Sequence, residues 1–238
     1  MTAAQRTSLS DEAIAGREVA LRAVPTGAPS GLVHHGWRHH AKRVMDITLT
    51  VALLPIALPV MAVIAIVIKS RSRGPVLFRH DRLGRDGRMF QMLKFRTMYV
   101  DATERLETEP GLFDAYVFND FKLSVDDDPR IVPGGRFLRR TSLDELPQLF
   151  NVLAGSMSLV GPRPIVAGEL ECYGKHAWAY LGVKPGITGR WQTDGRNHVR
   201  YPERAELDAD YVATWSLRQD VVILLKTVPK VLRRHGSH

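Results

Sequence analysis

The sequence predicts an α+β fold in which an N-terminal re-entrant membrane helix-break-helix is followed by a cytoplasmic, mainly helical domain with a short β-hairpin. An uncharged apolar run from Ile47 to Ile68 predicts the membrane segment. Two β-rich runs around a Gly-Arg-Asp-Gly turn predict the hairpin, and helical spacing of apolar residues dominates much of the remaining chain. We therefore expect a polar tail over residues 1–36, the re-entrant membrane-associated helix over 37–69 and the cytoplasmic domain over 70–238.

Composition excludes several classes of protein. The chain has 238 residues, which suits one domain with an appendage, and its hydrophobic content of 45% is too high for a disordered chain. The single cysteine, Cys172, cannot form an internal disulfide, which excludes a disulfide-stapled secreted scaffold and favours a reducing compartment. The net charge of +8 predicts an anionic partner, such as nucleic acid, a phosphate-bearing substrate or a membrane surface.

Residues 1–36 are interpreted as a polar tail. Prolines and glycines between Pro25 and Gly31 interrupt them, and they contain no apolar run long enough for the core of a signal peptide. Helical spacing between Asp11 and Val24 favours at most a short helix, and no residue pattern in the tail indicates catalysis.

The run from Ile47 to Ile68 is expected to lie in a bilayer because it contains no charged residue. At about 1.5 Å per residue it would form about 33 Å of helix, enough to cross a hydrocarbon core of about 30 Å. The alternative is a buried core helix of a soluble protein, which is disfavoured because such helices are usually shorter.

Whether this segment crosses the bilayer is a separate question. Pro59 near its middle, with Pro55 one turn earlier, favours a break between two half-helices that enter and leave the same leaflet. Positive charge marks the cytoplasmic side, and here both ends are basic. A kinked helix that spans the bilayer, with one terminus in the periplasm, stays open as the alternative. The flanking cations are Arg38, Lys42 and Arg43 on one side and Lys69, Arg71, Arg73 and Arg79 on the other.

The remainder of the chain is expected to combine the hairpin with several helices. The last helix carries lysines and arginines beside its apolar residues, which suits the interface of an anionic membrane or packing on the core of the domain itself. The hairpin is predicted from 75–78, a turn at 84–87 and 89–95, and helices from 143–153, 166–180, 203–214 and 217–234, with a broken helical stretch at 101–123.

Adjacent carboxylates, Asp144 and Glu145, stand at the start of an apolar helical run. A helix N-terminus favours both an ionised carboxylate and an anionic ligand, because its N–H groups are free and its dipole is positive there. The structural alternative is a capping box between Ser142 and Glu145, and spacing alone favours it. Pro147 argues for Asp144 as the N-cap instead, since proline is tolerated in the first turn.

Other segments have patterns that suit phosphate or a nucleotide. Two prolines hold Arg163 in an extended loop that would present its guanidinium to phosphate, although a rigid surface turn has the same pattern. Lys94 and Arg96 alternate along a strand and so share one face, as on many solvated sheets. Glycine turns around Trp191 suit a base and ribose, or a packed tryptophan. The Asp126–Asp128 run is interpreted as a solvated loop and not as a cation site.

Six short motifs occur in order along the chain. They are Lys42-Arg43-x-x-Asp46, Lys94-Phe95-Arg96-Thr97-Met98, Leu143-Asp144-Glu145-Leu146-Pro147-Gln148-Leu149, Gly161-Pro162-Arg163-Pro164, Lys184-Pro185-Gly186-Ile187-Thr188-Gly189 and Gly195-Arg196-Asn197. Together they resemble the bacterial sugar transferase family, the monotopic phosphoglycosyl transferases, from about residue 40 to the C-terminus. The chain is most similar to the small exopolysaccharide-initiating undecaprenyl-phosphate galactose or glucose phosphotransferases.

The resemblance implies a transferase that moves a hexose 1-phosphate from a UDP-sugar to undecaprenyl phosphate and releases UMP, in exopolysaccharide or other glycoconjugate synthesis. It implies a covalent phosphosugar intermediate on Asp144, and Mg²⁺ at Glu145 and Asp144. It also implies placement at the bacterial inner membrane, among its lipids, with the catalytic domain on the cytoplasmic face. Contacts to the phosphates and the nucleotide are implied for Lys94, Arg96, Arg163, Gln192, Arg196 and Asn197.

Physical reasoning agrees with these implications. A carboxylate that attacks a diphosphate must overcome repulsion between like charges, so it needs Mg²⁺ and basic side chains nearby. One departure from the family pattern is Leu58-Pro59, where some relatives have Ser-Pro, which leaves the sharpness of the membrane break open.

A membrane-anchored, basic nucleic-acid-binding or scaffolding protein is the alternative function. Only the net charge favours it. The chain has no recognisable nucleic-acid-binding module and its cations cluster around the apolar segment, so we do not expect nucleic acid as a partner. The sugar (galactose, glucose or an N-acetylated sugar), the polymer made and the oligomeric state stay open.

Overall fold

The computed structural model describes residues 37–108, 110–112, 123, 128–194 and 199–232. The predicted tail therefore lies outside the described residues. The chain forms two compact units, which are treated separately below. The first comprises Met1–Ala52, Arg79–Met92 and Gln148–Pro229, and the second comprises Leu53–Phe78, Leu93–Pro147 and Lys230–His238.

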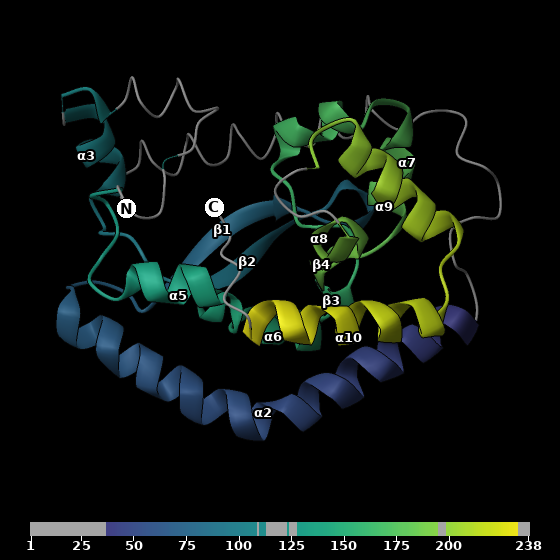
Figure 1. Ribbon diagram of the computed structural model, residues 1–238, viewed down its shortest axis with the longest axis horizontal. Helices are drawn as coiled ribbons and strands as arrows, with labels where there is room; N and C mark the ends of the chain where they lie inside the picture. Colours follow the sequence, from purple (N-terminus) through teal and green to yellow (C-terminus); the bar gives the residue numbers. More distant parts are fainter. Residues whose placement is uncertain (1–36, 109, 113–122, 124–127, 195–198, 233–238) are drawn as a thin grey trace. The chain divides into compact units, whose positions relative to one another are not determined.

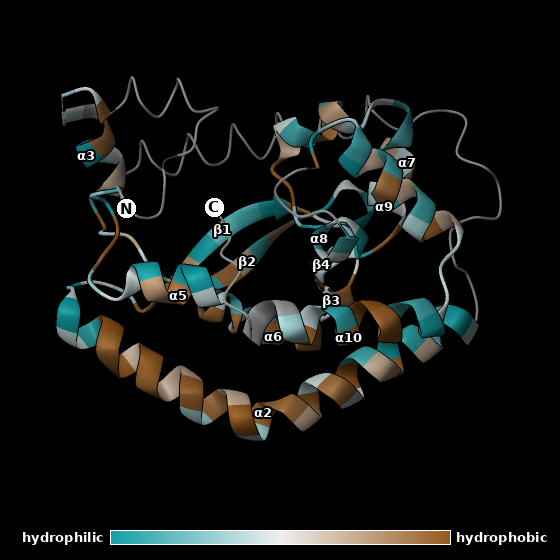
Figure 2. Ribbon diagram, in the orientation of Figure 1, coloured by the Kyte–Doolittle hydropathy of each residue, from teal (hydrophilic) through white to brown (hydrophobic). Residues whose placement is uncertain are grey.

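The apolar run forms the greater part of one long helix, α2 (Trp37–Arg71). Its mean hydropathy reaches 2.9 over the most apolar 18-residue window, and only 22% of that window is buried. Figure 2 shows hydrophobic residues along most of α2 and hydrophilic residues at both ends. A core helix of a soluble protein would be mostly buried, so this exposure disfavours that alternative and agrees with a helix surrounded by lipid.

The predicted interruption of this helix is wrong, because α2 is helical throughout and contains both Pro55 and Pro59. A proline removes one hydrogen bond to the preceding turn, but the neighbouring residues keep their own bonds. The prolines therefore weaken α2 without ending it.

The predicted hairpin is confirmed. Strands β1 (Leu77–Leu83) and β2 (Met89–Phe95) form a two-stranded sheet, shown in Figure 1. The connecting turn closes with a hydrogen bond of 2.8 Å from Gly84 N to Arg88 O. Asp86 and Gly87 adopt positive φ values of 59° and 71° in this turn, a conformation that aspartate and glycine tolerate better than most residues.

The first unit contains a pair of strands that the sequence analysis did not predict. Strands β3 (Ser158–Val160) and β4 (Gly186–Thr188) are parallel, with Ser158 opposite Gly186 and Val160 opposite Thr188. Each strand is only three residues long, too short for a period-2 pattern to stand out.

Glycines allow the loop after β3 to pass directly against β4. A Cβ at Gly161 would lie 2.5 Å from Lys184 O, and a Cβ at Gly186 would collide with the backbone nitrogen of Gly161. The close approach leaves room for hydrogen bonds from Gly161 N to Thr188 O (2.9 Å) and from Gly186 N to Pro162 O (2.8 Å). The Gly-Pro-Arg-Pro and Lys-Pro-Gly-Ile-Thr-Gly motifs therefore pack directly against each other.

Helices surround this strand pair in the first unit. They bury a core around Tyr180, whose hydroxyl donates to Leu83 O at 2.6 Å and accepts from Ile165 N at 3.2 Å. The helices are α6 (Gln148–Ala154), the 3-10 helix η3 (Ala167–His176), α7 (Ala177–Gly182), α8 (Arg190–Asp194), α9 (Glu203–Ala213) and α10 (Leu217–Leu232).

The predicted helices at 203–214 and 217–234 are confirmed as α9 and α10. The prediction of one helix over 143–153 is wrong, because a 3-10 turn precedes Pro147 and α6 begins after it. The prediction over 166–180 is also inaccurate, because η3 gives way to α7 beyond a non-helical Gly174.

Helix α10 agrees with both interpretations of its sequence, packing on the core of the domain and lying at a membrane interface. It buries Ile223 and Asp220 inside the first unit. Its other side leaves a row of large apolar residues exposed, as an interfacial helix would. That row consists of Val221, Val222, Leu225 and Val228.

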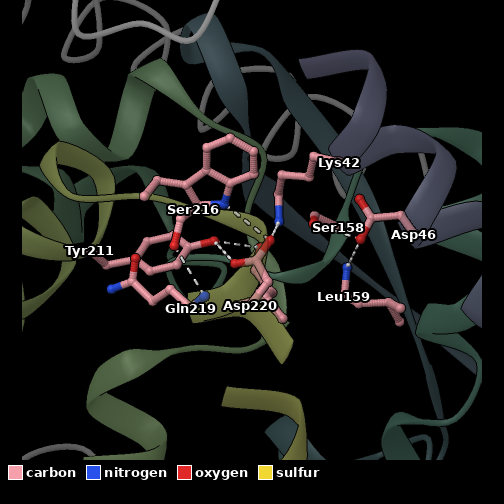
Figure 3. A network of polar contacts seen from close by, with 10 residues as sticks. Lys42, Asp46, Ser158, Leu159, Tyr211, Ser216, Gln219 and Asp220 are labelled. Atoms are coloured by element: carbon pink, nitrogen blue, oxygen red, sulfur yellow. Dashed lines mark hydrogen bonds and ion pairs between the residues drawn. The ribbon is translucent and has the colours of Figure 1, made fainter. Parts of the chain in front are cut away.

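Polar contacts attach the first turns of α2 to the rest of the first unit, as Figure 3 shows. Lys42 Nζ lies 2.6 Å from Asp220 Oδ2, and Asp220 is fully buried. Tyr211 and Trp215 donate to the same carboxylate at 2.8 and 3.0 Å. A buried carboxylate is stable only when its oxygens are satisfied, and these three donors satisfy it.

The next turn of α2 adds two further attachments. Asp46 accepts hydrogen bonds from Ser158 Oγ and Leu159 N, both at 3.1 Å. Arg43 donates to the carbonyl oxygens of Val152 and Leu153 at 2.5 and 2.8 Å, at the C-terminus of α6. A cation is favourable there because the last carbonyls of a helix have no intrahelical partner. The Lys-Arg-x-x-Asp motif therefore anchors the helix.

The second unit contains α3 (Ala102–Thr108), α5 (Gly135–Thr141) and the 3-10 turn η2 (Leu143–Glu145). An antiparallel bridge joins Met98 to Ile131, and Val132 N donates to Thr97 O at 3.0 Å. These contacts hold the segment after β2 beside the residues that precede α5. Within the predicted stretch 101–123, residues 109 and 113–122 lie outside the described residues.

Substitution of Gly186 by alanine should lower the free energy of unfolding by about 1–3 kcal/mol, because the added Cβ forces β3 and β4 apart. The measurement is chemical unfolding of the purified chain. Gly168→Ala is the matched control, since a Cβ at Gly168 meets nothing within 4 Å. Equal stability of the two variants would contradict the close approach of the strands.

Candidate active site

The adjacent carboxylates lie in the second unit, on a turn between two helices. Asp144 and Glu145 belong to η2, which follows α5. Ser142 separates the two elements with a φ of 57° and makes no hydrogen bond from its side chain to the helix start. The predicted capping box is therefore wrong. In the left-handed conformation Ser142 does not direct its hydroxyl at the next turn, and Glu145 is engaged elsewhere.

Asp144 is buried, with 8% of its surface exposed. The pKa of its carboxyl group is raised from 3.8 to about 6, mainly because the group is buried and also because the Glu145 carboxylate lies next to it. The cations of Lys94 and Arg139 act in the opposite direction and lower that pKa. Asp144 is therefore a partly desolvated carboxylate whose ionised form depends on nearby positive charge.

Two basic residues from separate segments supply this charge. Lys94 in β2 donates to Glu145 Oε1 at 2.7 Å. Arg139 in α5 donates from Nε to Thr97 Oγ1 at 2.9 Å, which orients its guanidinium. Lys94 was predicted as a site residue, and Arg139 was not. The signal for Arg139 was its place in the pair of arginines that precedes the two carboxylates by a few residues.

The structure places Arg96 differently from its prediction as a phosphate ligand. Only 5% of it is exposed. Its Nε donates to Pro75 O at 2.6 Å, and its Nη2 donates to the carbonyl and hydroxyl oxygens of Ser72 at 3.2 and 2.8 Å. Lys94 and Arg96 do not act together on one solvated face, because Arg96 is buried and its guanidinium is bound to these oxygens. Arg96 connects β2 to the residues that follow α2.

Asp128 is also structural. Its carboxylate takes both guanidinium donors of Arg130, Nε and Nη2, at 2.8 Å. This bidentate pair occupies the oxygens that a cation would need. Asp126 and Asp127 lie outside the described residues.

Arg163 and Gln192 lie in the first unit. Arg163 is exposed on the loop after β3, near the half-buried Arg82, and its charge contributes to lowering the pKa of Arg82. Gln192 in α8 donates weakly to Ile187 O at 3.4 Å, and its buried Oε1 has no hydrogen-bond partner within the described part of the chain. Arg196 and Asn197 lie outside the described residues.

Asp144 and Glu145 match what Mg²⁺ requires from a protein. Within the residues that the structure describes, no cluster of three or more His, Cys, Asp or Glu side chains is placed to hold a metal. Mg²⁺ in phosphoryl-transfer sites usually takes only one or two carboxylates and completes its shell with substrate phosphates and water. Mutual repulsion of two adjacent carboxylates also favours a cation between them.

Comparisons with known proteins identify a matching family. The family model for bacterial sugar transferases matches residues 37–234. The chain belongs to the bacterial sugar transferase family. Its match begins at the first residue of α2 and ends beyond α10, so the long apolar helix is part of this sugar transferase's family fold.

Curated relatives of this sugar transferase come from several bacteria. A protein from Erwinia amylovora named UDP-galactose-lipid carrier transferase is 47% identical over 83% of this chain. A protein from Salmonella typhimurium named undecaprenyl-phosphate galactose phosphotransferase is 48% identical over 83% of it. The chain spans only 41% of the length of each of these two relatives. By contrast, it spans 88% of the exopolysaccharide production protein ExoY of Rhizobium meliloti, with 43% identity.

Replacing Lys94 by methionine should raise the pKa of Asp144 above its value of about 6, because the cation that lowers it is lost. The measurement is an NMR titration of the purified chain with ¹³C-labelled aspartate carboxyl groups. Arg136→Gln is the matched control, since Arg136 is an exposed cation of α5 that does not influence Asp144. An unchanged or lowered pKa in Lys94→Met would contradict the electrostatic role given to Lys94.

Proposed function

We propose that this protein is a phosphoglycosyl transferase that moves a hexose 1-phosphate from a UDP-sugar to undecaprenyl phosphate and releases UMP. The observation that carries the proposal is the desolvated Asp144 carboxylate beside Glu145, Lys94 and Arg139. The names of the Erwinia and Salmonella relatives support the donor and acceptor classes, and the name of the Rhizobium relative supports a place in exopolysaccharide synthesis.

In the first half-reaction, a carboxylate oxygen of Asp144 attacks the phosphorus that bears the sugar. A bond forms between this oxygen and the phosphorus, and the bond from the phosphorus to the bridging oxygen of the diphosphate breaks. UMP leaves with the electron pair, and the sugar phosphate stays on Asp144 as an acyl phosphate. A carboxylate nucleophile is suited to this step because it divides one transfer into two displacements.

In the second half-reaction, a phosphate oxygen of the polyprenyl acceptor attacks the same phosphorus. The bond to Asp144 breaks, the free carboxylate returns, and the polyprenyl diphosphate-sugar departs. Because donor and acceptor react in separate steps, the kinetics should be ping-pong.

The surroundings of Asp144 support its use as a nucleophile. A pKa of about 6 leaves most of the carboxylate ionised at neutral pH, while its burial removes water that would weaken its nucleophilicity. Lys94 and Arg139 maintain the ionised form. Arg139 is also aligned by Thr97, and its proposed role is to counter charge on the incoming diphosphate.

Glu145 and Asp144 are the residues that would hold Mg²⁺. When bound, the ion would neutralise phosphate oxygens and polarise the phosphorus for attack. Glu145 is held in position by Lys94, so its carboxylate is already oriented before any ligand arrives. Gln192, Arg196 and Asn197 are proposed on the nucleotide side, and Arg163 is proposed near the phosphates. Lys94 is proposed near the phosphates, and the bonding of Arg96 supports an indirect role, through the position of β2.

The acceptor is a lipid and the donor is water-soluble, so the reaction requires a site at a membrane surface. The exposed apolar residues of α2 and α10 support attachment to the membrane. We propose that α2 stays helical but bends around Pro59, so that it enters and leaves one leaflet of the bacterial inner membrane, and that the catalytic residues face the cytoplasm. Basic residues at both ends of α2 support this topology.

Asp144→Asn should reduce UMP release by about 10³-fold or more, because an amide cannot form the acyl phosphate. The assay contains the full chain, Mg²⁺, undecaprenyl phosphate and a panel of UDP-hexoses and UDP-N-acetylhexosamines. Mass spectrometry of wild-type protein incubated with donor alone should find the phosphosugar on Asp144. The matched control is Asp101→Asn, an exposed aspartate of the same unit. Full turnover by Asp144→Asn, or turnover without an adduct on Asp144, would refute the mechanism.

A cysteine placed in the tail tests the topology. Ala20→Cys in a Cys172→Ser background should react with a membrane-impermeant maleimide only after cells are permeabilised. Cys172 of the wild-type chain is exposed and reports the side of the catalytic domain in the same assay. Labelling of position 20 from outside intact cells would show that α2 spans the bilayer.

A further inference from the structure

A cavity in the first unit lies where α2 begins. Its volume is about 360 Å³, within the range of small-molecule sites. Its walls come from the first turns of α2, the β1–β2 turn, β3, the residues after α7, and α9. None of the residues proposed above for chemistry, metal or nucleotide lines it. The established family and the proposed reaction therefore leave this cavity without a role.

Cationic side chains outnumber carboxylates in the lining of the cavity. Four cationic side chains line it, Lys42, Arg43, Arg85 and Lys184, against two carboxylates. Three of the four already have partners within the protein. Lys42 pairs with Asp220, Arg43 binds carbonyls of α6, and Arg85 pairs with Asp86 at 3.2 Å.

Lys184 differs from the other three cations. No hydrogen bond or salt bridge joins it to any residue in the described part of the chain, although it is half-buried. A Cβ built on Gly155 would lie 3.5 Å from both Lys184 Nζ and Arg43 Nη2, which places the two cations beside this glycine and within about 7 Å of each other. Burial lowers the pKa of Lys184, and the charges of Arg43, Arg85 and Lys42 lower it further, against the opposing effect of Asp46.

Two cations held together in a cavity are unfavourable unless an anion joins them. Other residues that line the cavity are apolar. Val160, Val212 and Trp215 supply apolar surface to its lining. The cavity therefore combines a site for a negative group with a surface for hydrocarbon, as a lipid headgroup and its glycerol would need.

We propose that this cavity binds the phosphate of an anionic membrane phospholipid, with Lys184 as its principal ligand. Its position supports a lipid over a soluble anion. The cavity opens beside the residues at which α2 changes from basic to apolar, and Ile47, Leu49 and Val51 are exposed on the turns that follow. Acyl chains would lie along these residues while the phosphate entered the cavity. Basic pockets beside membrane helices recognise lipid headgroups in this way.

The experiment uses the full chain in nanodiscs of equimolar phosphatidylglycerol and phosphatidylcholine, released into native mass spectrometry. The wild-type chain should retain one phosphatidylglycerol. Lys184→Gln should lower the retained fraction about tenfold, because a charge-assisted contact to phosphate is lost. Lys184→Arg should restore retention. Lys175→Gln is the matched control, since Lys175 is an exposed lysine of the same unit outside the cavity.

Competition separates the possible sources of phosphate. Neither millimolar inorganic phosphate nor a short-chain polyprenyl phosphate should displace the phospholipid. Displacement by inorganic phosphate would show a general anion site, and displacement by polyprenyl phosphate would assign the cavity to the acceptor; either result would overturn the proposal. So would equal retention by Lys184→Gln and Lys175→Gln. If Lys184→Gln has a lowered Tm, the fraction of phosphatidylglycerol retained by Arg85→Gln provides a second test, and it should also be lower than in the wild-type chain. The readout is binding, so it is independent of the proposed transferase activity.

Discussion

The proposed chemistry depends on a carboxylate that is buried next to a second carboxylate. Desolvation and the charge of Glu145 both disfavour ionised Asp144, while Lys94 and Arg139 favour it. These opposing effects hold its pKa at about 6. The group is then ionised at neutral pH, and the arrival of a cation or a phosphate would still shift its protonation. Other features of the second unit serve this balance. The left-handed Ser142 separates η2 from α5, and Thr97 fixes the guanidinium of Arg139.

A related principle operates at the start of α2. A helix with an apolar surface needs a defined attachment if it is to hold a catalytic domain at a membrane. Asp220 provides this attachment, because its fully buried carboxylate binds Lys42, Tyr211 and Trp215. The same turns place Arg43 at the C-terminus of α6, beside Lys184, which has no salt-bridge partner among the described residues. The cations at the start of α2 would then serve both to anchor the helix and to bind lipid. This would explain why the cluster contains a lysine, Lys184, that the anchor does not use.

Much of the architecture was predictable because it depends on continuous stretches of sequence. The turn that contains Asp86 and Gly87, the helices α9 and α10 and the apolar character of α2 all follow from local pattern. The predictions that were wrong concern local patterns that are compatible with two different backbone conformations. Ser142 and Glu145 have the spacing of a capping box, but the backbone of Ser142 turns away from it. Pro59 has the pattern of a helix break, but the surrounding hydrogen bonds keep α2 continuous.

The sequence by itself determined the membrane segment, the hairpin, the last two helices and the pair Asp144 and Glu145, because periodicity, turn chemistry and adjacency are properties of neighbouring residues. Only the tertiary structure decided which long-range partners each side chain has. It joined the two glycine motifs through β3 and β4, tied Arg96 to Ser72 and Pro75, and brought Arg139 close to Asp144. The physical reason is that these contacts are fixed by the packing of distant segments, whose close approach no local pattern specifies.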